Sequence, residues 1–178
     1  MTGDGEALFR AVCENPTDDT PRLVYADWLQ ENGQPERGEF ILLQCEAWNL
    51  LPAYPTQAAA RGRASELLRT HGDRWYAELP HVDCVVWSSL FVRGFVDRAH
   101  VLGRHFLTYL DRIFATAPVH TLIMADAFDV ERLHKLFNHP HLGRLGTLRM
   151  PNTTFTGESL RLLESVQHRY PNTKFTSY

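Results

Sequence analysis

The sequence of 178 residues predicts an α/β protein in which an N-terminal helical cap precedes a short solenoid of parallel strands with outer helices. Three observations predict this class. Apolar residues recur at helical spacing in the first part of the chain, β-branched and aromatic residues become frequent after His81, and short extended segments then recur at a nearly constant interval. We therefore place the helical domain over residues 1–80 and the repeat domain over residues 81–178.

Local signals divide the helical domain into separate helices. The first predicted helix covers residues 4–13 and ends before Asn15-Pro16, because proline disfavours helix in the preceding residue. The second has Thr20 as N-cap and Pro21 in its first turn, and it ends at Gly33, which can adopt a left-handed conformation. Its apolar residues cover most of its circumference, so we expect it to be largely buried.

Two more helices and a hairpin complete the region before the repeats. The third predicted helix begins at Pro35 and is amphipathic. The fourth covers residues 57–71, and Gly72 permits a turn after it. The β-branched and aromatic residues from Val82 to Val96 then predict a hairpin or two strands that lead into the repeats.

The repeat extends from about Val92 to Tyr178. The strand column contains Phe95, Leu122, Leu148 and Phe175, which follow one another at nearly equal steps. Two helix columns share this step and contain Phe106, Leu133 and Leu160, and Tyr109, Leu136 and Leu163. A strand-then-helix unit of this length is typical of a leucine-rich-repeat solenoid, whose units must stack to bury their apolar faces. Such a fold predicts a scaffold for binding.

The helical domain also resembles a known family. Residues 8–44 contain the uninterrupted run PRLVYADWL and resemble the bacterial repeat-companion domain, whose pattern is roughly PxDDxPRLVYADWLxExGxxxRxEFIxLQ. At the position just before the final Leu-Gln of the pattern, the family has a basic residue and this chain has leucine. The resemblance implies a companion domain that precedes leucine-rich-like repeats, in a family without an assigned biochemical activity.

The composition of the chain argues against some classes of function. The net charge of −3 argues against a dedicated nucleic-acid binder. The cysteines Cys13, Cys45 and Cys84 are odd in number and far apart, which favours free thiols in a reducing compartment. The sequence shows neither a signal peptide nor an apolar run as long as a membrane span. We therefore expect a cytoplasmic protein that does not contact membranes.

Two groups of residues could support an enzyme. Asp27 lies in the apolar second helix, where a buried carboxylate needs a partner, and we expect it to cap the next helix or to pair with Arg22 or Arg37. His134, His139 and His141 have a spacing that invites a zinc hypothesis, but the first lies in a predicted helix and the others in a loop. We interpret Asp27 as structural and the loop histidines as solvated, and we expect no catalysis, metal or cofactor.

The repeat surface is the predicted binding site. Side chains between the apolar positions of the strands should form one mildly basic column that contains Arg93, His120, Ile123, Arg149 and Lys174. This column favours noncatalytic recognition of a protein partner, although it could also be only a solvated sheet face. A second partner site is expected at the last strand, where Phe175 and Tyr178 could meet another copy of the chain or a different protein.

A nucleic-acid-binding accessory subunit is the alternative function. It would use a basic helix face beside Trp75 and Tyr76 that contains Arg61, Arg63, Arg69 and Arg74. Acidic residues are interleaved with these arginines, so we interpret this face as solvated.

Overall fold

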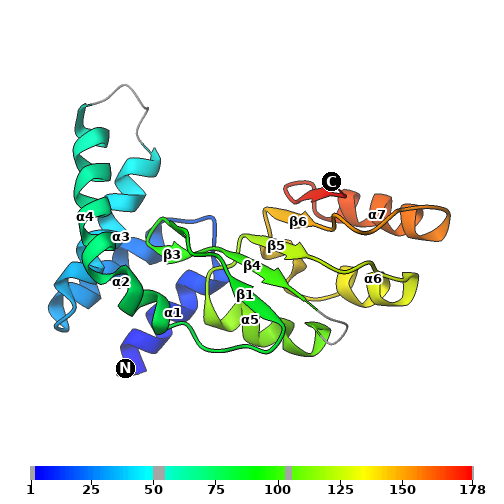
Figure 1. Cartoon of the computed structure of the whole chain (residues 1–178), viewed down its shortest axis with the longest axis horizontal. Helices are drawn as coiled ribbons and strands as arrows, with labels where there is room; N and C mark the ends of the chain where they lie inside the picture. The colour runs from blue at the N-terminus through cyan, green and yellow to red at the C-terminus, as the bar shows by residue number, and fades with distance from the viewer. Residues whose placement is uncertain (1–2, 50–54, 103–105, 178) are drawn as a thin grey trace. The chain divides into compact units, whose positions relative to one another are not determined.

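The computed structural model describes residues 3–49, 55–102 and 106–177 and divides the chain into two compact units (Figure 1). Unit 1 consists of Met1–Pro80 and Ser89–Val96, and unit 2 consists of His81–Ser88 and Asp97–Tyr178. The chain thus leaves unit 1 after Pro80 and returns to it for Ser89–Val96. The boundary that the sequence predicts after residue 80 leaves out this returning segment.

The helical part of unit 1 contains α1 (Gly3–Glu14), α2 (Thr20–Glu31), α3 (Pro35–Asn49) and α4 (Pro55–Ala77). Gly33 has a φ of 80° just after α2, which confirms the predicted end of that helix. The N-cap prediction was wrong by one residue, since α2 begins at Thr20 itself and the Asp18 carboxylate accepts a hydrogen bond from Thr20 N (2.8 Å).

The predicted turn at Gly72 is absent, since α4 continues through this residue to Ala77. The continuation carries Trp75 into the core, where its ring lies 4.8 Å from that of Phe40. Burying a large aromatic ring contributes more than the roughly 1 kcal/mol that a glycine costs inside a helix. Tertiary packing therefore decides the length of α4.

A two-stranded hairpin belongs to unit 1. It is formed by β2 (Phe91–Val92) and β3 (Phe95–Val96), and the turn residues Arg93 and Gly94 have φ angles of 49° and 87°. Positive φ at both positions is what a two-residue hairpin turn of type I′ requires. A Cβ at Gly94 would lie 2.9 Å from Ile41 Cα, so the turn packs on α3 at a distance that only glycine permits.

The hairpin joins two apolar clusters in unit 1. Phe95 packs in the first, whose other buried members are Val12, Tyr25, Ala26, Leu29, Ile41 and Cys45. Phe91 packs against the second, which contains Phe40, Ala64, Leu67 and Trp75. The strand column of the repeat was therefore wrong in its first member, because Phe95 lies in this hairpin and not in the sheet of unit 2.

Between these clusters lies the guanidinium of Arg37. Its Cζ is 4.8 to 5.6 Å from the ring centres of Phe40, Trp75, Phe91 and Phe95. Burial lowers the pKa of Arg37 to about 10. Attraction between a cation and these ring faces compensates part of the cost of burying the charge, and it ties the hairpin to α3 and α4.

Unit 2 is built on a five-stranded sheet in the order β1-β4-β5-β6-β7. The strands are β1 (Val85–Trp87), β4 (Arg98–Val101), β5 (Thr121–Met124), β6 (Thr147–Arg149) and β7 (Lys174–Thr176). β1 is antiparallel to β4, and the remaining pairs are parallel. The predicted α/β class is thereby confirmed.

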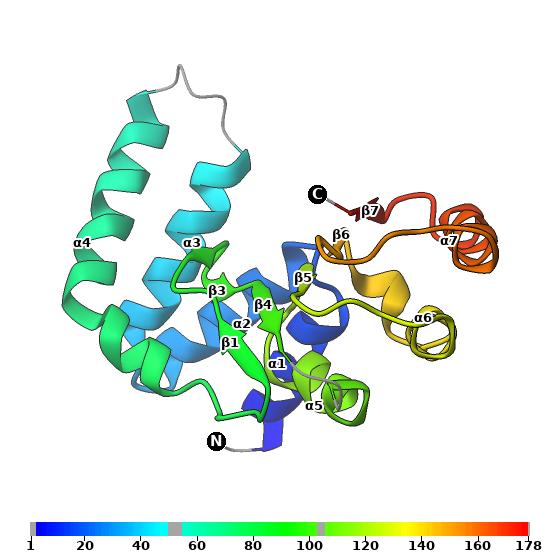
Figure 2. The same ribbon diagram turned by 45° about the vertical axis from the view of Figure 1, so that its right-hand side comes forward.

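Short helices connect the parallel strands of unit 2. They are η1 (Phe106–Tyr109), α5 (Leu110–Thr116), α6 (Val130–Phe137), η2 (Leu142–Arg144) and α7 (Glu158–Arg169). Figure 2 shows α5, α6 and α7 along the same side of the strands. The Asp129 carboxylate accepts a hydrogen bond from Arg132 N and so caps the start of α6.

The strand register confirms three members of the predicted column. Leu122 lies opposite Leu148, and Leu148 lies opposite Phe175. Ala99 occupies the position in the column that was predicted for Phe95, and it lies opposite Leu122. Ala99 and Leu122 are closer in sequence than one repeat step. Leu122, Leu148 and Ala99 are fully buried, and the Phe175 ring packs edge to face on Phe137 at 6.0 Å.

The helix columns hold only in part. Leu133 and Leu136 of α6 are buried, as predicted, but Leu160 of α7 is 42% exposed. The buried positions of α7 are Ser159 and Val166, so α7 presents a neighbouring face of the helix to the core. The side chain of Phe106 and the residue Tyr178 lie outside the described part of the chain.

Candidate functional site

The side of the sheet that faces away from the helices carries the candidate site. Successive side chains of a strand point to opposite faces, and the buried Leu122 and Leu148 point to the helices. Their neighbours therefore form the opposite face, which we call the polar sheet face. It contains one row of Arg98, Thr121, Thr147 and Lys174 and a second row of His100, Ile123, Arg149 and Thr176.

The charge on the polar sheet face is of one sign. Arg98, Arg149 and Lys174 are cationic, and no aspartate or glutamate stands at the paired positions of β4 to β7. Nε of Arg98 is buried and makes no hydrogen bond within the described residues. An array of this kind favours anionic groups and repels cationic ones.

Accessibility is greatest at the β6–β7 end of the polar sheet face. Arg149 and Lys174 are exposed, whereas Arg98 and His100 are half-buried and Thr121 and Ile123 are buried. Arg149 lies opposite Thr176, two residues beyond Lys174 on the adjacent strand, so the two cations are diagonal neighbours. A large partner would reach this pair first.

The structure brings together three of the five residues of the predicted column. Ile123, Arg149 and Lys174 share the polar sheet face. His120 lies just before β5, where its carbonyl accepts hydrogen bonds from the backbone N of Gly146 (2.9 Å) and of Thr147 (3.0 Å).

Arg93 does not belong to this column, and its placement there was wrong. It lies in the hairpin of unit 1, nearly buried, and its guanidinium donates to the carbonyls of Pro16 (2.6 Å) and Thr17 (3.0 Å) and to Asp19 Oδ1 (3.0 Å). Sequence reasoning missed Arg98 and His100, because the first strand had been assigned to the segment around Phe95. The alternation of polar and apolar residues in Arg98–Val101 was the signal for this strand.

Asp27 does not have the predicted structural role. Its side chain is exposed, and within the described residues its carboxylate has no recorded hydrogen bond or ion pair. The buried charge of α2 is instead Arg22, whose Nη2 donates to the carbonyl of Pro16 (2.7 Å) and whose Cζ lies 5.4 Å from the Phe95 ring centre. Arg22 and Arg93 together hold the turn between α1 and α2.

Two of the three histidines contact the same carboxylate, and the third has a different partner. His139 Nε2 and His141 Nε2 lie 3.5 and 3.3 Å from Asp111 Oδ1 of α5, while His134 is exposed and contacts Asn138. Burial lowers the pKa of His139, and the nearby carboxylate of Asp111 opposes this shift. Among the described residues, no group of three or more His, Cys, Asp or Glu side chains could hold a metal ion.

Half of the arginines on the basic helix face are paired with carboxylates. Arg63 of α4 forms ion pairs with Glu39 (2.8 Å) and Glu66 (2.9 Å), and Arg74 forms one with Glu78 (3.2 Å). The other two arginines of this face, Arg61 and Arg69, have no carboxylate partner in the part of the chain that the structure describes. A continuous basic stripe, as a nucleic-acid backbone requires, is therefore not present on α4.

The protein is therefore a mixed α/β protein with a mostly parallel five-stranded sheet. The charged residues at the paired positions of its polar sheet face are all basic. No protein-family model, curated protein or solved structure matches the chain. Within residues 3–49, 55–102 and 106–177, every helix is too short or too polar to cross a bilayer.

Proposed function

We propose that the chain is a noncatalytic recognition or scaffold module that binds an acidic surface of a partner protein through the polar sheet face. The observation that carries this proposal is the exposed pair Arg149 and Lys174 on adjacent strands, on a face whose paired positions contain no carboxylate. Charges of one sign steer association with a complementary surface and reject wrong partners.

We further propose that unit 2 is a short leucine-rich-repeat-like solenoid and that the helical region before it is a repeat-companion domain. The in-register column of Leu122, Leu148 and Phe175 supports the first part of this proposal. The run PRLVYADWL supports the second. Repeat modules of this kind present their sheet as a binding surface, which agrees with the proposed role of the polar sheet face.

Charge reversal on the polar sheet face tests the proposed function. Partners captured from the native cell by the full chain are identified by mass spectrometry, and the affinity of the purified partner is then measured by calorimetry. Arg149→Glu and Lys174→Glu should each weaken binding at least about 5-fold at low salt, and together by more, because each reverses an attraction. Circular dichroism should show an unchanged fold for these variants.

Arg161→Glu on α7 is the matched control, since Arg161 is also an exposed arginine but lies in the helix layer. It should leave the affinity within about twofold of the wild-type value. Equal affinity of the double reversal and the wild type would move the binding site away from the polar sheet face. Loss of the captured partners after nuclease treatment would support the nucleic-acid alternative.

A further inference from the structure

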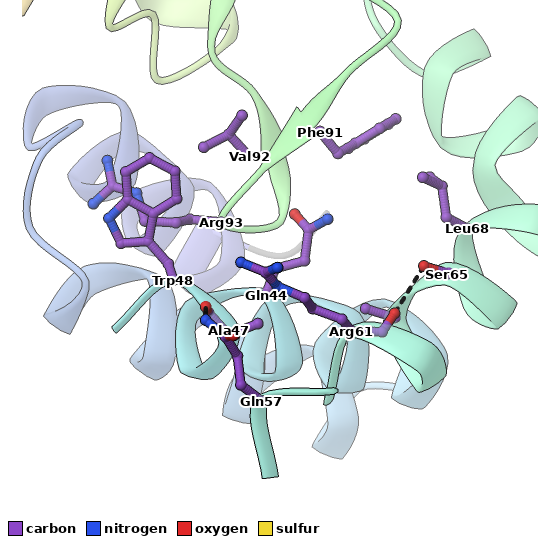
Figure 3. Close-up of a pocket in the computed structure, with 11 residues that line it drawn as sticks. Gln44, Ala47, Trp48, Gln57, Arg61, Ser65, Leu68, Phe91, Val92 and Arg93 are labelled. Carbon is purple, nitrogen blue, oxygen red and sulfur yellow. Dashed lines mark hydrogen bonds between the residues drawn. The ribbon is translucent and has the colours of Figure 1, made fainter. Parts of the chain in front are cut away.

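Unit 1 contains a pocket of about 560 Å³ that the sequence did not predict (Figure 3). Its walls come from α3, α4 and β2. The lining residues are Gln44, Ala47, Trp48, Gln57, Arg61, Ala64, Ser65, Leu68, Phe91, Val92 and Arg93. The pocket lies wholly within unit 1, so it is distinct from the polar sheet face of unit 2.

Arg61 and Gln44 give this pocket side chains that can donate hydrogen bonds to an occupant. Arg61 has no carboxylate partner within the described residues, in contrast to Arg63 and Arg74 of the same helix. Gln44 Oε1 accepts a hydrogen bond from Gly94 N (2.7 Å), which leaves the amide NH₂ of Gln44 to donate. Figure 3 shows the Arg61 side chain extending from α4 toward the side of the pocket where Gln44 and Trp48 lie.

None of the described residues that line the pocket is acidic. The second guanidinium of the lining, that of Arg93, is bound to Asp19 and to two backbone carbonyls. Arg61 therefore supplies the positive charge that an occupant would meet. A carboxylate is the complementary group, because a guanidinium can bind both of its oxygens.

The rest of the lining is mostly apolar and partly aromatic, apart from Gln57 and Ser65, whose side chains donate to the backbone carbonyls of Ala47 and Arg61. Trp48 is 62% exposed, and its ring centre lies 5.5 Å from Cζ of Arg93, which holds one face of the indole. Leu68, Phe91 and Val92 are half-buried and face the same space. An exposed tryptophan and an arginine beside apolar side chains are typical of protein-recognition hot spots.

We propose that this pocket binds an acidic peptide segment of a partner protein, in which a large apolar residue stands next to aspartate or glutamate. The apolar side chain packs against Trp48, Leu68 and Phe91, and the adjacent carboxylate accepts hydrogen bonds from Arg61 and from the Gln44 amide. Trp48 is more than half exposed, so this wall of the pocket is accessible to a partner.

Two other occupants fit the observations less well. A single-stranded nucleic acid needs a positively charged groove that follows several phosphates, and Arg61 is a single cation with Arg63 already paired to two glutamates. A small carboxylic acid would be enclosed on most sides in a typical ligand site, which the exposure of Trp48 does not provide. The proposal is independent of the function assigned to the polar sheet face.

The test is a selection from a random dodecapeptide display library against the full chain, with prior removal of the peptides that bind the Arg61→Gln variant. Enriched peptides should contain Phe, Trp or Leu next to Asp or Glu. Their affinities are then measured by fluorescence anisotropy with the wild type and with Arg61→Gln, Trp48→Ala and Arg69→Gln. Arg69 is the matched control, an exposed arginine of α4 that does not line the pocket.

Arg61→Gln and Trp48→Ala should each weaken peptide binding at least about 10-fold, and Arg69→Gln should change it less than about twofold. Arg149→Glu should also leave it unchanged, which separates this site from the polar sheet face. The proposal is overturned if no acidic peptides are enriched, or if their binding is insensitive to Arg61→Gln. It is equally overturned if oligothymidylate or phenylpropionate binds with the affinity of the best peptide and displaces it.

Discussion

At the scale of single residues, Arg93 connects the hairpin of unit 1 to the turn between α1 and α2. Its guanidinium donates three hydrogen bonds of 2.6 to 3.0 Å to Pro16, Thr17 and Asp19. Arg93→Met should therefore lower the free energy of unfolding by about 2 to 4 kcal/mol, since the half-buried Asp19 carboxylate loses its ion pair with Arg93 and the buried Pro16 carbonyl keeps only its hydrogen bond from Arg22.

Urea denaturation followed by circular dichroism measures this loss. Asp27→Asn is the contrasting change, because Asp27 is exposed and should alter the free energy of unfolding by less than about 0.5 kcal/mol. A loss at Asp27 as large as that at Arg93 would contradict the assignment of the buried charges to arginine.

His139 should make the stability of unit 2 sensitive to acid. Burial lowers its pKa below the ordinary value of 6.5, and the charges of His141 and Arg144 act in the same direction against the opposing Asp111 carboxylate. The folded state then binds a proton at His139 more weakly than the unfolded chain does. The contribution of neutral His139 is therefore present above about pH 6.5 and decreases as the pH falls below this value.

The measurement compares urea midpoints at about pH 7.5 and about pH 5.5 for the wild type and His139→Gln. The variant should lose less stability on acidification than the wild type. His134→Gln, a change at an exposed histidine, should behave as the wild type does. Identical acid sensitivity in His139→Gln and the wild type would assign the effect to other groups.

At the scale of elements, the parallel sheet depends on the column of Leu122, Leu148 and Phe175. Leu148 has no exposed surface and lies between the other two in the strand register. Leu148→Ala should lower the free energy of unfolding by about 2 to 5 kcal/mol, because the surrounding structure cannot fully close the cavity.

Thr147→Ala serves as the control for that prediction, since Thr147 is the preceding residue of β6 and points to the opposite face. It should cost less than about 1 kcal/mol. A loss below about 1 kcal/mol for Leu148→Ala would show that the core of unit 2 does not depend on this register.

At the scale of the whole molecule, the hairpin makes unit 1 discontinuous in sequence. A fragment of residues 1–80 lacks Phe91, Arg93, Gly94 and Phe95, which complete two apolar clusters and the turn before α2. A fragment of residues 1–96 contains them. Its melting temperature should exceed that of the shorter fragment by at least about 10 °C, given the apolar area that the two phenylalanines bury.

Thermal unfolding of the fragments 1–80 and 1–96, followed by circular dichroism, tests this prediction. A fragment of residues 1–96 with Phe95→Ser is the control and should lose most of the gain, because Phe95 lies in the first cluster. Equal melting temperatures for residues 1–80 and 1–96 would show that the four helices form unit 1 without the hairpin.

The sequence alone was sufficient for the features that depend on neighbouring residues and on regular spacing. Proline in the first turns of α2 and α3 and glycine after α2 marked helix ends, because these residues act on their own backbone. The spacing of Leu122, Leu148 and Phe175 identified three parallel strands in register, since each unit buries the same position against its neighbour. Arg149 and Lys174 followed from that register.

Only the tertiary structure decided which of several segments with similar local sequence patterns forms a given strand or buried contact. The segment around Phe95 has the β-branched and aromatic character of a repeat strand, but Gly94 turns it back onto Ile41 of α3, a contact between residues far apart in the chain. Because of that contact, Arg93 lies in the hairpin and not in the sheet of unit 2. The strand next to β5 is β4. Likewise, helical periodicity could not tell which charged residue of α2 is buried, because the partners of Arg22 come from the preceding turn and from the hairpin.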